Sequence, residues 1–266
     1  MPDGIVSTNG SLQGTFNLGG VFGLISYGGP ITNTTYSGGL VRGYSAGMLS
    51  LGGFIGDVYN CSFTGCSVIT ANGVTGYVNN ASSYTLAIGG FAGTMRNSSA
   101  TNCYTGNPVT VPQYNLCTGN LGAGGFCGML WMDDTTTKLE SCYATGNIDV
   151  VSRSNYYYTY PAYIGDHTGG LVGIAFSESG PKAVITKCYA LGNVKVTSHA
   201  SYSGTPVADA LPVFCTAGGL VGTAHSTQIS ECYAKGDVTA TKAAGTVAVT
   251  AGGLVGYLGW FNDNAS

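Results

Sequence analysis

The chain has 266 residues, and 44 of them are Gly, whereas only 8% are charged. An ordinary soluble domain has about 7% Gly and about 25% charged residues. A net charge of −3 excludes the basic footprint of a nucleic-acid-binding protein, and a hydrophobic content of 44% excludes a disordered chain. Because Gly costs about 1 kcal/mol at each helical position, we expect a β-rich chain with many tight turns.

Residues 1–18 precede the first recognisable repeat, and we expect them to form an N-terminal segment or linker. The start, Met1-Pro2-Asp3-Gly4, lacks the basic and apolar regions of a signal peptide. The long uncharged stretch at residues 97–132 is interrupted by Asn, Pro and Gln. We therefore expect no membrane insertion of this chain.

From Gly19 onward the chain repeats one word, Gly-Gly-apolar-x-Gly. Glycine in such a word marks a corner where neighbouring backbones approach closely. The seven copies hold 21 of the 44 glycines. They begin at Gly19, Gly52, Gly89, Gly124, Gly169, Gly218 and Gly252.

A second word, Cys-Tyr-small-x-Gly-Asn/Asp-apolar, alternates with the first. Clear copies start at Cys142, Cys188 and Cys232, a shorter copy starts at Cys103, and degenerate copies start at Cys61 and Thr35. Period-two alternation places Cys and the small residue inside and Tyr outside. We expect two columns of stacked side chains, formed by Tyr104, Tyr143, Tyr189 and Tyr233 and by Asn107, Asn147, Asn193 and Asp237.

Either word recurs about every 39 residues. A unit of two or three short strands cannot bury its own apolar face, so the copies must stack. We predict an all-β fold, a parallel β-solenoid of six to seven repeats that forms a single domain over residues 19–266, with degenerate repeats at 19–60. A seven-bladed propeller is the alternative, because seven copies of this length fit seven blades.

The two words resemble the GLUG-repeat family, named for its Gly-Leu-x-Gly core. The best matches are Leu171-Val172-Gly173, Leu220-Val221-Gly222 and Leu254-Val255-Gly256, each preceded by Gly-Gly. Such repeats occur in bacterial surface and secreted proteins, including adhesin-like proteins and the noncatalytic region of IgA-cleaving metallopeptidases. The resemblance implies a β-helical scaffold located outside the cell or at its surface, and it does not imply catalysis.

The cysteines are candidates for a structural ladder. Adjacent coils, about 4.8 Å apart, bring two Cα atoms within disulfide range, so the thiols either form disulfides or remain free as small apolar fillers. The chain contains no Cys-x-x-Cys and no His-Glu-x-x-His motif, and we expect no metal or other cofactor. The ladder assigned to one repeat position consists of Cys61, Cys103, Cys142, Cys188 and Cys232.

Two further sets of residues are candidate surface sites. N-x-Ser/Thr sequons, which mark exposed loops of secreted glycoproteins, occur at Asn9, Asn33, Asn60, Asn80, Asn97 and Asn264. Exposed tyrosines suit contacts with a glycan or a protein, and a loop folded back over the solenoid is the alternative interpretation. The tyrosines cluster in a long insertion between two words, at Tyr156, Tyr157, Tyr158, Tyr160 and Tyr163.

The carboxylates are scattered, and Asp133-Asp134 is the only adjacent pair, so we expect no enzymatic activity. We predict an extracellular structural or adhesive protein, a rod that projects from a surface or assembles head to tail into a filament. Its expected partners are further copies of itself and a glycan or protein of the host or the environment. A glycan-binding or glycan-processing module and the noncatalytic stalk of a larger secreted protease are the alternatives.

Overall fold

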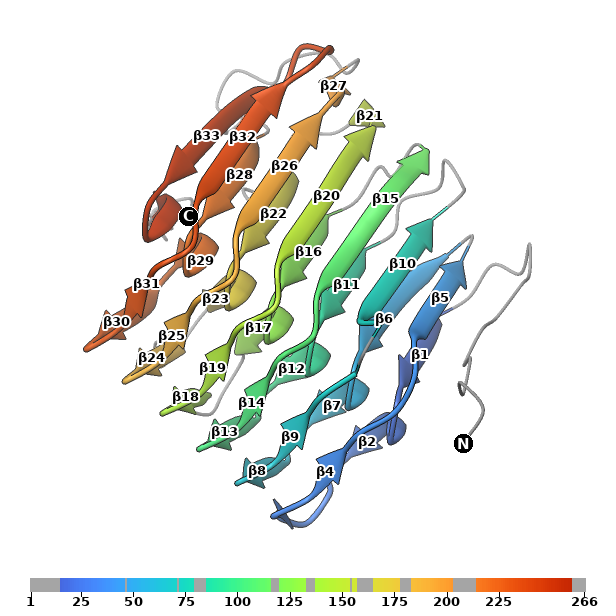
Figure 1. Ribbon diagram of the computed structural model, residues 1–266, viewed down its shortest axis with the longest axis vertical. Helices are drawn as coiled ribbons and strands as arrows, with labels where there is room; N and C mark the ends of the chain where they lie inside the picture. The colour runs from blue at the N-terminus through green and yellow to red at the C-terminus, as the bar shows by residue number, and fades with distance from the viewer. Residues whose placement is uncertain are drawn as a thin grey trace, which may run out of the picture.

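The computed structural model describes residues 15–45, 47–70, 72–78, 85–115, 120–132, 137–153, 155–156, 165–177, 183–202 and 214–259. These residues form a parallel β-solenoid in which coil follows coil from one end of the molecule to the other (Figure 1). Strands of neighbouring coils pair in parallel and in register. The propeller alternative is therefore wrong, because propeller blades are antiparallel sheets.

Each coil contributes one strand to each of several sheets. The central sheet contains β1 (Thr15–Gly19), β6 (Met48–Gly52), β11 (Leu86–Gly89), β16 (Leu121–Gly124), β22 (Gly165–Gly169), β28 (Phe214–Gly218) and β33 (Ala248–Gly252). The return sheet contains β2 (Phe22–Ser26), β7 (Ile55–Tyr59), β12 (Ala92–Arg96), β17 (Cys127–Met132), β23 (Val172–Ser177), β29 (Val221–His225) and β34 (Val255–Gly259).

Three sheets complete the circuit. The first side sheet contains β3 (Ile31–Thr32), β8 (Ser62–Thr64), β13 (Ser99–Thr101), β18 (Lys138–Glu140), β24 (Ala183–Thr186) and β30 (Thr227–Ser230). The second side sheet contains β4 (Thr35–Tyr36), β9 (Ser67–Val68), β14 (Tyr104–Thr105), β19 (Tyr143–Ala144), β25 (Tyr189–Ala190) and β31 (Tyr233–Ala234). The outer sheet contains β5 (Val41–Ser45), β10 (Val74–Val78), β15 (Val109–Asn115), β20 (Ile148–Arg153), β26 (Val194–Ser198) and β32 (Val238–Lys242).

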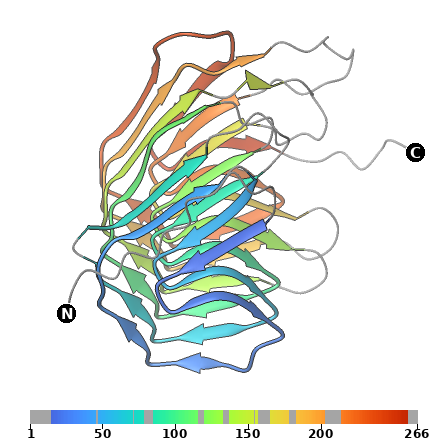
Figure 2. The same cartoon turned by 90° about the vertical axis from the view of Figure 1, so that its right-hand side faces the viewer.

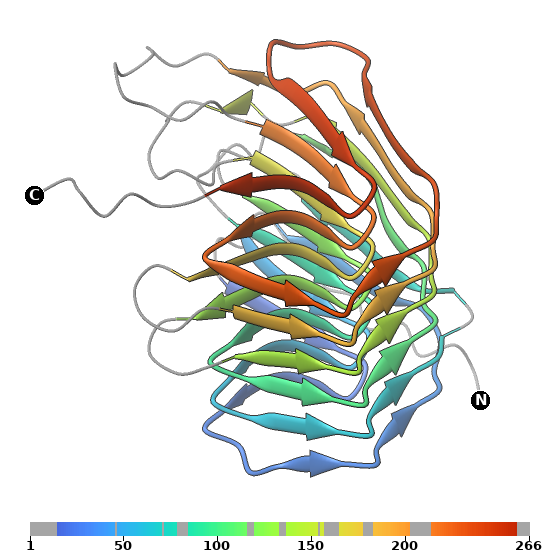
Figure 3. The same cartoon turned by 90° about the vertical axis from the view of Figure 1, so that its left-hand side faces the viewer.

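The central sheet lies between the outer sheet and the return sheet, and the stacked coils are visible end-on in Figures 2 and 3. One apolar core fills the space between the outer and central sheets, with Val150 and Leu86 among its residues. A second core is enclosed by the return sheet and the two side sheets, and it contains a row of stacked rings. Phe91 lies 4.9 Å from Phe54 and 4.7 Å from Phe126, ring centre to ring centre. Both cores therefore run along the whole stack.

Close backbone contacts explain all three glycines of the repeated word. A Cβ atom on Gly89 would lie 2.0 Å from the carbonyl oxygen of Ala92 across the arch. On Gly90 it would lie 2.1 Å from the carbonyl oxygen of Gly125 in the next coil, and on Gly93 it would lie 2.4 Å from the amide of Leu51 in the central sheet. The word therefore closes the arch, sets the coil spacing and lets two sheets pack without side chains between them.

Left-handed turns account for the polar residue that precedes most ladder cysteines. Asn102, Ser141, Lys187 and Glu231 all have φ between 52° and 54°. This conformation favours Asn, whereas Ser, Lys and Glu adopt it here because the paired strands on both sides fix the turn.

The loops absorb the variation in repeat length. Paired residues of the central sheet are 33 positions apart between Thr15 and Met48 and 49 positions apart between Asp166 and Cys215. In the two longest coils, β21 (Asn155–Tyr156) and β27 (Ser201–Tyr202) form an extra two-stranded sheet. The first described strand begins at Thr15, inside the segment that the sequence suggested as a linker.

Candidate functional site

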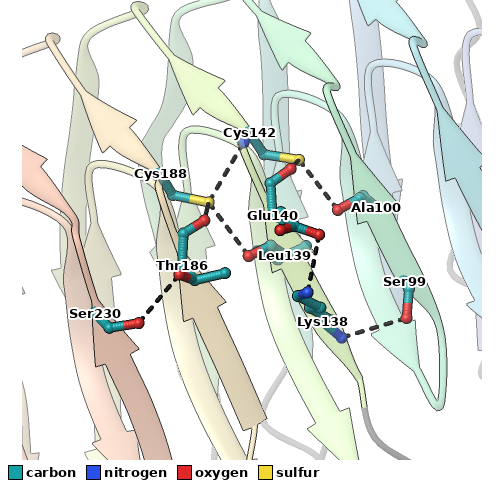
Figure 4. Close-up of polar contacts among 9 residues, drawn as sticks. All are labelled: Ser99, Ala100, Lys138, Leu139, Glu140, Cys142, Thr186, Cys188 and Ser230. Carbon is teal, nitrogen blue, oxygen red and sulfur yellow. Dashed lines mark hydrogen bonds and ion pairs between the residues drawn. The ribbon is translucent and has the colours of Figure 1, made fainter.

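A column of cysteines occupies the turn between the two side sheets. Its members are Cys66, Cys103, Cys142, Cys188 and Cys232. The amide of Cys142 donates to Sγ of Cys188 at 3.4 Å, and the amide of Cys188 donates to Sγ of Cys232 at 3.3 Å. The thiol of Cys142 in turn donates to the carbonyl of Ala100 at 3.3 Å (Figure 4). The sulfur atoms thus satisfy backbone groups of the turn, as buried polar groups require.

The assignment of Cys61 to this column is wrong, and Cys66 takes its place. The amide of Cys61 donates to Oγ of Ser98 at 3.2 Å, at the turn that precedes the column in the coil. The amide of Cys66 donates to Sγ of Cys103. Both cysteines follow a left-handed residue, Asn60 or Gly65, so the local pattern is the same at the two turns.

The chemistry of the column is that of buried thiols. All eight cysteines in the described ranges are free, and Cys117 lies outside those ranges. Burial raises the pKa of the Cys142 thiol well above its usual value, so this thiol is protonated at neutral pH. Within the described residues, no group of three His, Cys, Asp or Glu side chains could hold a metal ion. The column is a packing and hydrogen-bonding device.

The predicted tyrosine column is confirmed on the second side sheet. The rings of Tyr104, Tyr143, Tyr189 and Tyr233 stack at 4.7 to 5.0 Å with interplanar angles of 4° to 7°. Because each ring covers the face of its neighbour, the faces are unavailable for stacking against a ligand, except at the end of the row.

The predicted asparagine column is confirmed in part. The side-chain oxygens of Asn147 and Asn193 each accept the amide of the next coil at 2.9 Å. Asn107 is not a member, because it pairs with the position of Gly146 and is fully buried. Its side chain accepts the amide of Thr70 and donates to the carbonyl of Gly90 at 3.1 Å.

The sequons and the tyrosine cluster are only partly described. Asn33 is exposed, Asn60 is half-buried and Asn97 is buried, and all three lie in left-handed turns. Tyr156 lies in the short strand β21. The remaining candidates lie outside the described residues, namely Asn9, Asn80, Asn264, Tyr157, Tyr158, Tyr160 and Tyr163. Glycosylation of the sequons and binding by the tyrosines stay predictions.

A cleft opens between the central and return sheets of the first four coils. Its volume is about 140 Å³. Side chains that project into the gap from the two sheets meet here, and Oγ of Ser50 lies 2.9 Å from Oγ1 of Thr94. The lining residues are Thr15, Met48, Ser50, Asp57, Thr85, Thr94, Arg96, Met129 and Trp131.

One carboxylate and one guanidinium give the cleft its charge. Burial raises the pKa of the Asp57 carboxyl, and the nearby Arg96 partly opposes that effect. The guanidinium of Arg96 lies 4.5 Å from the ring centre of Trp131 and 5.6 Å from that of Tyr59. These cation–π contacts hold the arginine between two aromatic side chains. The cleft therefore combines an acceptor, a donor and hydroxyl groups on a rigid sheet framework.

Comparison with known protein families identifies the repeat. Residues 215–239 match the family model described as the GLUG motif. The chain carries the GLUG motif. The matched segment runs from β28 in the central sheet to the start of β32 in the outer sheet, so the motif covers most of one coil of the solenoid. No curated protein and no solved structure matches the chain.

The strand register places the words of neighbouring coils at equivalent positions, with Gly169, Gly218 and Gly252 in one row. Among the described residues, no helical segment has the length and hydropathy that crossing a membrane requires.

Proposed function

We propose that this GLUG protein is an extracellular structural or adhesive scaffold whose coils stack end to end with those of further copies. The observation that carries the proposal is the character of the two terminal coils. Four of their strands, β1, β2, β33 and β34, contain no charged residue. Natural sheets protect exposed edges with charges, Pro or bulges, and an uncharged edge pairs readily with another strand.

The apolar core also reaches both ends of the stack. In the interior coils Phe126 and Leu171 are fully buried, whereas Leu254, at the equivalent position of the last coil, is 39% exposed. Leu258 pairs with the buried Ala224 at the end of its column and is 72% exposed. At the opposite end of the stack, Phe22 pairs with the buried Ile55 and is 36% exposed. A second copy placed head to tail would continue these columns and cover them. Such a heterologous contact does not close on itself, so it generates a filament.

The space beside Gly253 is open where each other copy of the word contacts the next coil. In the six preceding copies of the word, a Cβ atom on the second glycine would lie 2.0 to 2.3 Å from the glycine carbonyl of the next coil. At Gly253 the same atom would meet nothing within 4 Å. In a stacked assembly Gly253 would face Gly20 of the next copy. An alanine at this position is therefore compatible with the single chain and incompatible with the stack.

Negative-stain microscopy of three proteins tests the proposal. The wild type should form rods that lengthen with concentration, and Leu258→Lys should remain as single particles because it places a charge on the end of the core. Ile69→Lys is the matched control, because Ile69 is 51% exposed on a side turn rather than at an end. Rods of equal length for Leu258→Lys and the wild type, or single particles of the wild type at high concentration, would contradict the proposal.

The noncatalytic stalk of a larger secreted protease remains the alternative. In that case other parts of the same polypeptide, rather than a second copy, would cover the terminal coils. The wild-type chain would then stay as single particles. Ile69→Lys and Leu258→Lys would not differ from it.

A further inference from the structure

We propose that the cleft between the central and return sheets binds a neutral saccharide, with one sugar ring inserted between the sheets. This inference does not depend on end-to-end stacking. It rests on the side chains that β6, β7, β12 and β17 place around a volume of about 140 Å³. A cavity of this size holds several waters in a polar setting, which is room for one small ring.

The charges of the cleft select an uncharged ligand. The carboxylate of Asp57 and the guanidinium of Arg96 have opposite charges, so the repulsion of an ionic ligand by one of them offsets its attraction by the other. Transfer of the ligand's ionic group out of water is then an uncompensated cost. A hydroxyl group, by contrast, can donate to a carboxylate and accept from a guanidinium. A ligand with hydroxyl groups on neighbouring carbons would use both side chains at once, and hydrogen bonds to ionised groups are the stronger ones.

The remaining lining residues suit the two kinds of surface that a sugar ring presents. Ser50 and Thr94 line the cleft with hydroxyl groups whose oxygens are 2.9 Å apart. The indole N–H of Trp131 is buried and has no hydrogen-bond partner within the described residues, so it is a donor available to a ligand. The side chains of Met48 and Met129 provide apolar surface for the C–H face of the ring.

A free monosaccharide with about a dozen heavy atoms is expected to bind with about millimolar affinity. Methyl-labelled methionine is the best reporter, because the sequence has five methionines and two of them line the cleft. Met95 is fully buried in the core of the return sheet and serves as an internal reference.

The experiment titrates the methyl-labelled full chain with glucose, galactose, mannose and N-acetylglucosamine, followed by glucuronate and glucosamine. At least one neutral sugar should shift the methyl signals of Met48 and Met129 in a saturable way and leave Met95 unchanged. Glucuronate and glucosamine should bind at least about tenfold more weakly, because the desolvation of their charge is not offset in a cleft that contains one carboxylate and one guanidinium. No shift with any neutral sugar, or tighter binding of a charged one, would overturn the proposal.

Two variants assign the effect to the cleft. Asp57→Asn should weaken the binding about tenfold or more, because it removes a charged acceptor. Asp149→Asn, on the outer sheet, is the matched control and should bind like the wild type. Equal affinity of Asp57→Asn and the wild type would overturn the assignment. The length of the rods seen by microscopy is a separate readout, so a failure here leaves the stacking proposal testable on its own.

Discussion

The substitution Gly90→Ala tests the coil spacing that the repeated glycine word is argued to set. The added Cβ would lie 2.1 Å from the carbonyl oxygen of Gly125, which is backbone and cannot rotate away. Real Cβ atoms keep at least 3.0 Å from such an atom, so the two coils must separate locally by about 0.9 Å.

The cost follows from the hydrogen bonds that join the two coils at this point. The amide of Gly90 lies 3.0 Å from the oxygen of Gly125, and the amide of Phe91 lies 2.9 Å from the oxygen of Phe126. A separation of about 0.9 Å takes both beyond hydrogen-bond distance. Each buried amide left without a partner costs about 1–3 kcal/mol. We therefore expect Gly90→Ala to lower the free energy of unfolding by about 2–6 kcal/mol.

Urea unfolding followed by far-UV circular dichroism measures this difference. Gly253→Ala is the matched control, because it occupies the same position of the word in the last coil and its Cβ meets nothing within 4 Å. At a protein concentration low enough to keep the chain in single copies, its unfolding free energy should stay within about 0.5 kcal/mol of the wild type. Equal destabilisation by the two substitutions would refute the argument from close backbone approach.

Three further predictions concern single side chains. Asn107→Ala should lower the free energy of unfolding by about 1–3 kcal/mol, because it leaves the amide of Thr70 and the carbonyl of Gly90 without their partner. Asn147→Ala, in the exposed column, is the control and should lower it by less than about 1 kcal/mol in the same urea experiment. Asp57→Asn should stabilise the protein at neutral pH. Burial raises the pKa of Asp57, so the folded state binds the proton more tightly than the unfolded state does. The wild type therefore loses stability as the pH rises from the ordinary pKa of 3.8 through the raised pKa. Urea unfolding across this pH range should show that the stability gained by Asp57→Asn grows with pH, and a constant gain would contradict the assignment. Cys142 should resist alkylation by iodoacetamide in the native protein at mildly alkaline pH, because burial both covers its thiol and raises its pKa. It should react once the protein is unfolded. Mass spectrometry of the alkylated peptides measures the difference, and rapid labelling of Cys142 in the native protein would contradict its burial in the column.

The fold was predictable from the sequence because the repeat words report directly on backbone contacts. The spacing of the words predicts parallel stacking, and the tyrosine column follows from period-two alternation. The residues that belong to the columns at the turns were harder to predict. Asn60-Cys61 and Gly65-Cys66 both combine a left-handed residue with a cysteine, and only the strand pairing of Ser67 with Tyr104 shows which cysteine is in register.

Asn107 illustrates the same difficulty. The pair Gly106-Asn107 looks like Gly146-Asn147, but it is displaced by one position relative to the strands on either side. A shift by one residue moves a side chain from the surface to the interior. The asparagine at this position is therefore buried and bonded to two coils instead of lying in the exposed column.

The residues that line the cleft occur at regular positions after the glycine word, but the sequence alone does not show that they line a cleft. Asp57, Thr94 and Met129 each follow the last glycine of their word, and Arg96 and Trp131 lie two positions further on. These offsets place the residues in two columns of the return sheet. That the columns line an open gap depends on how the central sheet lies opposite, and this arrangement has no counterpart in local sequence.

Sedimentation velocity of the wild type and Gly253→Ala over a range of concentrations tests the central claim most directly. If the solenoid is built to be continued coil on coil, the wild type should sediment faster as its concentration rises, and Gly253→Ala should sediment as a single chain with an unchanged circular dichroism spectrum. Identical behaviour of the two proteins, whether both assemble or both stay single, would contradict the claim.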